Sequence, residues 1–351
     1  MLFVLFLYLM KSVVYFSAGI GDAVLLIPLI KALRKREHSV DGIFTAQYSN
    51  REIFSDTDLL DNIIILDKGR IRSLYKSAKH FKEYHNAYLN FFAATRTNLL
   101  GAKNIARNVF CIKKQKDKVT GMIPRINVTK PLKEIHDASQ NLRMLIPGAS
   151  DDMVNTEDFY LEFKSSGIPA ATPKYFTIEL SAGNNILKYK NWKITYWIEF
   201  LKMASQHFAK HNFILLGDSN EQELAQKIMD ENIRGVFSVC GKTSIKQVMN
   251  YLYHCQCFIG PDGGLMHLSN ALGKPTFTLW GISNPGMYGY SKLNSANHRI
   301  MKAANSISHS WIEPLSEQEL MKDHYLDSLI PEDVFREFTK FAKSLNIYVK
   351  N

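Results

Sequence analysis

Two short glycine-rich stretches, each with one aspartate, have the residue types needed to bind a phosphorylated ligand and to move a proton. They are FSAGIGD at residues 16–22 and GPDGG at residues 260–264. Glycines let the backbone approach a ligand closely, and a helix that starts after such a turn offers N–H groups and the positive end of its dipole to an anion. We therefore expect both stretches to lie at turns between a strand and a helix.

In the first stretch, Gly19 and Gly21 match two glycines of a dinucleotide-binding fingerprint, but Val24 stands where the third would be. Asp22 directly follows the second glycine. From the residues alone, Asp22 has two possible roles: it caps a helix that starts at Ala23, or it acts as a general base. The missing glycine argues against a dinucleotide-dependent oxidoreductase, and so does the lack of an acid after the next apolar run to hold a ribose.

The second stretch is predicted to form a tight turn at the carboxyl end of a strand, where open α/β sheets bind ligands. The backbone N–H groups near Gly263, Gly264 and Leu265 would then form a cradle for a diphosphate without a metal ion. Asp262 either shapes the turn or contacts the ligand. His267, one turn into the following helix, is either a hydrogen-bonded core residue or a second ligand contact.

Short apolar runs alternate with longer amphipathic runs along the chain, which predicts βαβ units and parallel sheets. The alternation breaks at residues 147–173, where proline and glycine are frequent, and we expect a domain junction there. The resulting prediction is an α/β protein of two doubly wound, Rossmann-like domains facing a central cleft, at residues 1–165 and 166–330, followed by an amphipathic helix at 331–351. Strands are expected at residues 12–16, 42–47, 62–67, 87–92, 175–180, 212–217, 235–240, 257–261 and 275–281, and helices at 23–36, 195–208, 221–230 and from 331.

The composition is that of a globular protein, with 46% hydrophobic and 22% charged residues and a net charge of +10. This charge favours an acidic partner, such as a phosphorylated glycan or an anionic membrane surface. The basic excess gathers between residues 103 and 133 and includes Lys113, Lys114 and Lys116. Aromatic residues do not alternate with these charges as they do in single-strand nucleic-acid grooves, so nucleic acid is not expected as a partner.

The four cysteines are few and unevenly spread, which favours buried thiols in a reducing cytoplasm over a disulfide framework. The apolar residues 1–9 are too short to span a bilayer, which needs about 20 apolar residues. We interpret residues 1–9 as the product of an upstream start codon or as a minor apolar appendage.

The segment GPDGGLMHLSNALGKPTFTLWG at residues 260–281 resembles the C-terminal signature of glycosyltransferase family 9, the ADP-heptose:lipopolysaccharide heptosyltransferases. In that family an aspartate, a small residue with a glycine, a His-Leu pair and an A-L-G-x-P stretch follow one another in this order. One departure is Gly263, because many relatives have Thr or Ser there and so carry a hydroxyl beside the donor.

Two further stretches are similar to the same family. The turn at residues 19–22 is followed by an apolar helix that contains Pro28, which is ordinary in the family although proline is unusual inside a helix. The loop SAGNNILKYKNW at residues 181–192 resembles the family's loop with a lysine, here Lys190, two residues before Trp192. The three motifs occur in the family's order and are spread over most of the chain.

The resemblance implies a GT-B fold and an inverting, metal-independent transfer of a sugar from a nucleotide diphosphate. It implies heptose from ADP-heptose as the donor, no other cofactor, and the lipopolysaccharide or lipooligosaccharide core or lipid A as the acceptor. Asp22 would be the general base on the acceptor side, where Gly19 and Gly21 make room for the sugars. The implied donor site comprises Ser181, Lys190, Asp262, Gly263, Gly264, Leu265 and His267.

An anionic acceptor would give a role to Lys113, Lys114 and Lys116, which would attract it to the acceptor domain. The implied location is the cytoplasm of a Gram-negative bacterium, with peripheral contact to the inner face of the inner membrane. Three alternatives stay open: a family 9 transferase with another donor such as a hexosamine, a nucleotide-sugar epimerase of similar build, and a non-catalytic relative that binds glycan or nucleotide sugar.

Overall fold

The structure of the chain is a computed structural model. It describes residues 10–36, 38–45, 49–66, 83–113, 126–165, 174–182, 190–304, 306–310, 316 and 325–347. The apolar residues 1–9 lie outside the described residues, as do Lys114 and Lys116 of the basic stretch.

The chain forms two compact units, Met1–Val154 and Asn155–Asn351. The division falls earlier than the boundary expected after residue 165. The reason is that η4 (Thr156–Phe159) packs against α10 (Gly264–Ala271) of the second unit, and the Leu161 N–H donates to the Ala271 carbonyl at 2.7 Å.

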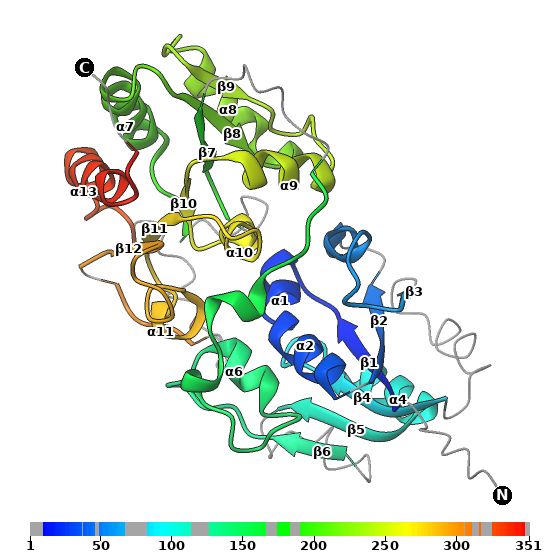
Figure 1. The fold of residues 1–351 in the computed structure, drawn as a ribbon. Helices are drawn as coiled ribbons and strands as arrows, with labels where there is room; N and C mark the ends of the chain where they lie inside the picture. Colours follow the sequence, from blue (N-terminus) through cyan, green and yellow to red (C-terminus); the bar gives the residue numbers. More distant parts are fainter. Residues whose placement is uncertain are drawn as a thin grey trace, which may run out of the picture. The chain divides into compact units, whose positions relative to one another are not determined.

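The first unit contains a six-stranded sheet of order β3-β2-β1-β4-β5-β6, in which every pair of neighbours is parallel (Figure 1). This is the Rossmann strand order. The chain adds strands toward one side of the sheet from β1 to β3 and toward the other side from β4 to β6, and we call the place between β1 and β4 the reversal point. Strands β5 and β6 were not predicted, because they fall within the basic stretch and lack the length of apolar sequence that marks a strand. The strands are β1 (Lys11–Phe16), β2 (Ser39–Thr45), β3 (Asn62–Leu66), β4 (Tyr84–Leu89), β5 (Ala106–Ile112) and β6 (Ile126–Thr129).

The second unit repeats the arrangement, with a parallel sheet of order β12-β11-β10-β7-β8-β9. Its direction reverses between β7 and β10. The prediction of two doubly wound α/β sheets is therefore confirmed, although the last strand, β12, was not predicted. The strands are β7 (Tyr175–Glu179), β8 (Asn212–Leu216), β9 (Val236–Ser238), β10 (Phe258–Pro261), β11 (Thr276–Trp280) and β12 (His298–Lys302).

The helix predicted at residues 23–36 is wrong: the structure has two helices, α1 (Ile20–Val24) and α2 (Ile27–Lys35), separated by a turn. Pro28 lies in the first turn of α2, where no backbone N–H is needed for the helix, so the proline does not interrupt a helix. Among the described residues of this unit, the other helices are η1 (Ser49–Phe54), α4 (Arg96–Ile105), α6 (Asp137–Leu142) and η3 (Asp151–Met153).

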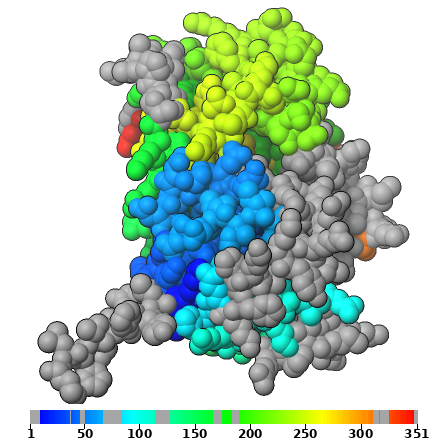
Figure 2. All heavy atoms as spheres, turned by 90° about the vertical axis from the view of Figure 1, so that its right-hand side faces the viewer, coloured from blue at the N-terminus to red at the C-terminus, as the bar shows by residue number. Residues whose placement is uncertain are grey.

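Figure 2 shows residues between β2 and β3 (light blue) on the surface of the first unit. Arg34 of α2 fastens this segment, because its guanidinium donates to the Asp61 carboxylate at 2.8 Å and to the Asp58 carbonyl at 2.8 Å.

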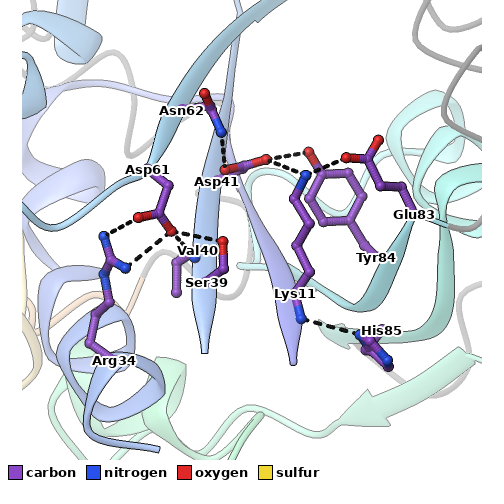
Figure 3. Close-up of polar contacts among 10 residues, drawn as sticks. All are labelled: Lys11, Arg34, Ser39, Val40, Asp41, Asp61, Asn62, Glu83, Tyr84 and His85. Carbon is purple, nitrogen blue, oxygen red and sulfur yellow. Dashed lines mark hydrogen bonds and ion pairs between the residues drawn. The ribbon is translucent and has the colours of Figure 1, made fainter. Parts of the chain in front are cut away.

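A polar network joins four strands at their amino ends, at the opposite edge of the sheet from the turn at residues 17–19 (Figure 3). The buried Asp41 carboxylate of β2 accepts from the Tyr84 hydroxyl at 2.6 Å and from the Asn62 amide at 2.9 Å. The Lys11 ammonium lies 3.4 Å from Asp41 and also pairs with Glu83. Because ligands of doubly wound sheets bind at the other edge, we assign this network to stability.

The core of the second unit includes the terminal helix α13 (Pro331–Ser344), which packs beside α7 (Ile194–His207) (Figure 1). Phe338 of α13 lies fully buried, with its ring 5.2 Å from that of Phe176 and 5.4 Å from that of Phe277. The helix is therefore part of the core of the second unit. The remaining helices are η6 (Ser219–Glu221), α8 (Gln222–Met229), α9 (Ile245–His254) and α11 (Pro285–Tyr288).

All four cysteines are buried thiols, as expected. Burial raises the pKa of Cys111, Cys240 and Cys255 to about 11, and that of Cys257 well above its usual range. Among the described residues, no helix has the length and apolar composition required to cross a membrane.

Candidate active site

The first glycine stretch lies at the reversal point of the first sheet, after the buried strand β1. Gly19 is the N-cap of α1, and Asp22 is the third residue of the helix, partly buried in its first turn. Asp22 is therefore not the N-cap residue. A carboxylate at this place is still favoured by the helix dipole, which stabilises its charged form.

Two asparagines and a lysine hold the loops around this turn. The Asn50 amide donates to the Ala18 carbonyl at 2.7 Å, and the Asn98 amide donates to the Ser17 hydroxyl at 3.0 Å. Lys113, at the carboxyl end of β5, donates to the Ala94 carbonyl at 2.9 Å. Of the three lysines predicted on the acceptor side, Lys113 thus lies at the ligand-binding edge of the sheet, while the other two lie outside the described residues.

A second carboxyl group, that of Asp137, faces Asp22 from α6. Burial and then the charge of Asp22 raise the pKa of Asp137 to about 7. The side chain of Asn141 donates to the Leu25 carbonyl just after α1, which fixes α6 against this turn. A carboxyl with a raised pKa holds its proton closer to neutral pH, so the negative charge of Asp22 favours the protonated form of Asp137.

In the second unit, the turn after β10 lies at the reversal point of that sheet. The first N–H groups of α10 have no acceptor within the helix. Gly263, the N-cap residue, has no side chain that could accept a hydrogen bond from them. Lys190 donates to the Asp262 carboxylate at 2.6 Å and to the Asp262 carbonyl at 3.1 Å, and its side chain is only 13% exposed. Burial by itself would raise the pKa of Asp262, but Lys190 and His267 outweigh it and lower the pKa. Asp262 is thus a buried, charged carboxylate in a pair with Lys190.

Ser181 is buried and donates its hydroxyl to the Glu221 carboxylate at 2.6 Å, and that carboxylate also accepts from the Asp218 N–H at 2.7 Å. Burial raises the pKa of Glu221 to about 7. Ser181 therefore orients Glu221 in this structure. His267 is also buried, and its Nδ1 forms a hydrogen bond of 2.7 Å with the Tyr290 hydroxyl, as in the core interpretation of this residue.

Glu179 ends β7 beside the same turn and was not singled out in the sequence. Its carboxyl is buried, and the Leu265 N–H donates to it. Burial and then the charge of Glu221 raise the pKa of Glu179 well above its usual range. The only signal in the sequence is an acid within the apolar run YFTIEL, and Asp137 and Glu221 have no comparable signal.

Lys190, Ser181 and the turn at residues 262–265 thus come together at one edge of the second sheet, although they are distant in the chain. They fall within residues 147–316, which match the family model described as Glycosyltransferase family 9 (heptosyltransferase). The resemblance to glycosyltransferase family 9 is confirmed. Asp22 and residues 1–146 of the first unit lie outside the matched residues.

Known members of family 9 are similar to this chain in sequence and in structure. Lipooligosaccharide heptosyltransferase 2 of Campylobacter jejuni serotype O:2 is 32% identical over 178 residues, which cover 48% of this chain and 51% of that protein. The chain spans about half the length of the curated relatives it matches.

Two solved structures resemble the whole chain. The ADP-heptose lipopolysaccharide heptosyltransferase II of E. coli is 16% identical with a TM-score of 0.72, over 96% of this chain and 100% of that one. The family 9 glycosyltransferase of Veillonella parvula is 17% identical with a TM-score of 0.76, over 95% and 97% of the two chains. The fold is therefore the GT-B fold of these enzymes.

Proposed function

We propose that this protein is an inverting glycosyltransferase that transfers heptose from ADP-heptose to the core of lipopolysaccharide or lipooligosaccharide. One observation carries the proposal: the Lys190–Asp262 pair and the start of α10 lie at the reversal point of the second sheet and within the residues that match the family model. The relatives of Campylobacter jejuni and E. coli named above are heptosyltransferases, which favours heptose over the hexosamine alternative.

In the proposed reaction, an acceptor hydroxyl attacks the anomeric carbon of the donor while the bond from that carbon to the diphosphate breaks. A single displacement of this kind inverts the anomeric carbon. Asp22 takes the hydroxyl proton as the new bond forms, since a hydroxyl becomes acidic when it attacks an electron-poor carbon. Gly19, whose missing side chain leaves the space in front of Asp22 open, gives the acceptor access to this carboxylate.

The departing diphosphate carries the larger charge. Lys190 and the first N–H groups of α10, apart from the Leu265 N–H that donates to Glu179, would stabilise it, because they are positioned before the reaction. Asp262 orients Lys190 and contacts the hydroxyls of the transferred sugar. The reaction as proposed needs no metal and no cofactor besides the nucleotide sugar.

Lys113 and its basic neighbours would attract an anionic acceptor. This part of the proposal places the enzyme in the cytoplasm, in peripheral contact with the anionic inner membrane of a Gram-negative bacterium. Reversal of charge in Lys113→Glu, Lys114→Glu and Lys116→Glu should raise the KM for the acceptor at low salt and leave ADP binding unchanged. Unchanged acceptor kinetics would contradict it.

The first experiment is isothermal titration of the purified protein, without metal, with ADP, UDP and GDP. We expect ADP to bind best, and Lys190→Ala to weaken it by roughly tenfold to a hundredfold. Lys193→Ala is the matched control, since Lys193 is 42% exposed and pairs with Asp327. Preference for UDP or GDP would contradict the heptose donor. Transfer from ADP-heptose to a core oligosaccharide, with the anomeric configuration read by NMR, tests the reaction itself.

A further inference from the structure

The Glu179 carboxyl lies beside the candidate donor site, and the contacts of the described residues do not explain its role. Glu179 is the last residue of β7, at the reversal point of the second sheet, and only 7% of its surface is exposed. Its Oε2 atom is buried and has no hydrogen-bond partner among the described residues. Buried polar atoms almost always have a partner, so Oε2 is a candidate to form a hydrogen bond with a bound ligand.

Oε2 points at the start of α10. A side chain at position 263 would place its Cβ 2.7 Å from Glu179 Oε2 and 3.2 Å from Glu179 Cδ, so the Glu179 carboxyl would have to move to admit it. The space for a side chain at position 263 is therefore filled by the Glu179 carboxyl. Gly263 and Glu179 form one packing unit at the N-cap of α10, where an anion is favoured.

Burial and the neighbouring negative charges favour the neutral form of Glu179. Glu221 and Asp262 face it as negative groups, and Lys190 is held by Asp262 at 2.6 Å. Burial and then Glu221 raise the pKa of Glu179 well above the ordinary value, while the Leu265 N–H and Lys190 oppose this. A neutral carboxyl has one O–H donor, and the ionised form would repel an anion at the same place.

We propose that Glu179 is part of the nucleotide-diphosphate site, where its protonated carboxyl donates a hydrogen bond to a phosphate oxygen of the ligand. The inference rests on the proposed function, because it places the diphosphate at the start of α10. It assigns to an acid a task usually given to a hydroxyl or an ammonium group. It follows that ADP binds the protonated form of Glu179 better than the ionised form, so affinity falls as pH rises through the pKa of this group.

The test is ADP affinity by isothermal titration from mildly acidic to mildly alkaline pH, for the wild type and for Glu179→Gln. The Gln amide has the shape of the acid and keeps an N–H donor at every pH. We expect the wild-type Kd to rise with pH, by at most about tenfold per pH unit, and the slope to be reduced in Glu179→Gln. Glu221→Gln removes the neighbouring carboxyl that titrates near neutral pH. Because the charge of Glu221 raises the pKa of Glu179, this variant should keep the pH dependence of ADP affinity and shift it to lower pH.

The outcomes separate this inference from the proposed function. A Glu179→Gln protein that binds ADP with the wild-type pH dependence overturns the inference alone, and so does a loss of the pH dependence in Glu221→Gln only. Failure of the wild type to bind ADP at any pH overturns both.

A second pair of variants tests the packing unit. Gly263→Ser should weaken ADP binding by about tenfold or more, because its Cβ collides with Glu179. In the Glu179→Ala background the same substitution should recover affinity, since the space is then empty and the serine hydroxyl supplies the donor. Independent, additive effects would overturn the assignment, and circular dichroism confirms that each variant is folded.

Discussion

Asp22 and Asp137 lie close enough that the charge of one raises the pKa of the other. Such pairs separate the roles of two acids, because one holds a proton while the other stays ionised and can accept one. Of the two, Asp22 lies in the glycine turn at the reversal point of the sheet, and we therefore assign the base to Asp22.

Asp22→Asn removes the proposed base and keeps the shape of the side chain. We expect kcat to fall by about a hundredfold to ten-thousandfold, while ADP affinity stays unchanged, because the proposed donor residues belong to the second unit. The rate of ADP release in the presence of acceptor measures kcat, and calorimetry measures ADP affinity. Asp58→Asn, an exposed acid of the same unit, is the control and should leave both unchanged. Equal losses in the two variants would contradict the assignment.

Asp137 predicts a pH dependence of stability. Its pKa is raised from 3.8 to about 7 in the folded protein, so the folded state binds the proton more tightly than the unfolded state. Stability is therefore lost as pH rises from about 4 to about 7, and Asp137→Asn should restore it above that range, by up to about 4 kcal/mol, and have little effect near pH 4. Denaturant unfolding at the two pH values measures this. A variant that is less stable at both would show that the charged form is needed.

At the scale of elements, strand order explains why residues far apart in the sequence meet. Each turn follows a strand next to the reversal point, β1 in the first sheet and β10 in the second, so the local sequence signal and the ligand-binding edge coincide. The opposite edge of the first sheet holds the network around Asp41, which joins four strands without any part in the proposed chemistry.

Asp41→Ala should therefore lower the free energy of unfolding of the first unit by about 2–4 kcal/mol, since it leaves the Tyr84 hydroxyl and the Lys11 ammonium without their shared acceptor. ADP affinity should be unchanged. The partly exposed Asp61 gives the contrast, with a loss of about 1 kcal/mol for Asp61→Ala. Denaturant unfolding measures the free energy of unfolding, and calorimetry measures ADP affinity. An equal loss of stability in Asp41→Ala and Asp61→Ala would contradict the role of burial.

The sequence patterns predicted the strands and helices whose apolar residues form a continuous run or recur at a regular spacing. They missed the strands without such a pattern. The strands β1, β7 and β11 are buried apolar runs and were predicted, whereas β5 begins directly after α4 in a stretch that looked merely basic. Pro28 was read as lying inside one helix because a period of apolar residues cannot show the turn between α1 and α2.

The same limit applies to the site. Turn residues such as Asp22 and Asp262 stand out locally, while Glu179 and Asp137 acquire their properties only from neighbours that folding brings near.

At the scale of the whole molecule, the second unit depends on the last helix of the chain. Phe338 of α13 packs on Phe176 and Phe277, which belong to two strands of the sheet that positions the donor residues. A chain that ends before Pro331 should lose ADP binding, although no proposed site residue is removed. Phe338→Ala should lower the free energy of unfolding by about 3–5 kcal/mol, and Phe335→Ala, only partly buried on the same helix, by less. Retained ADP binding in the shortened chain would show that α13 is dispensable.

The burial of every native cysteine has a practical consequence for the study of this protein. A thiol reacts with a maleimide as the thiolate, and these four thiols are both shielded and protonated at neutral pH. A cysteine introduced at an exposed position, for example at Lys242 in the second unit, should therefore take up a single fluorescent dye in the otherwise unaltered protein. Such a dye would report nucleotide capture in real time, without radioactive donor or acceptor glycan.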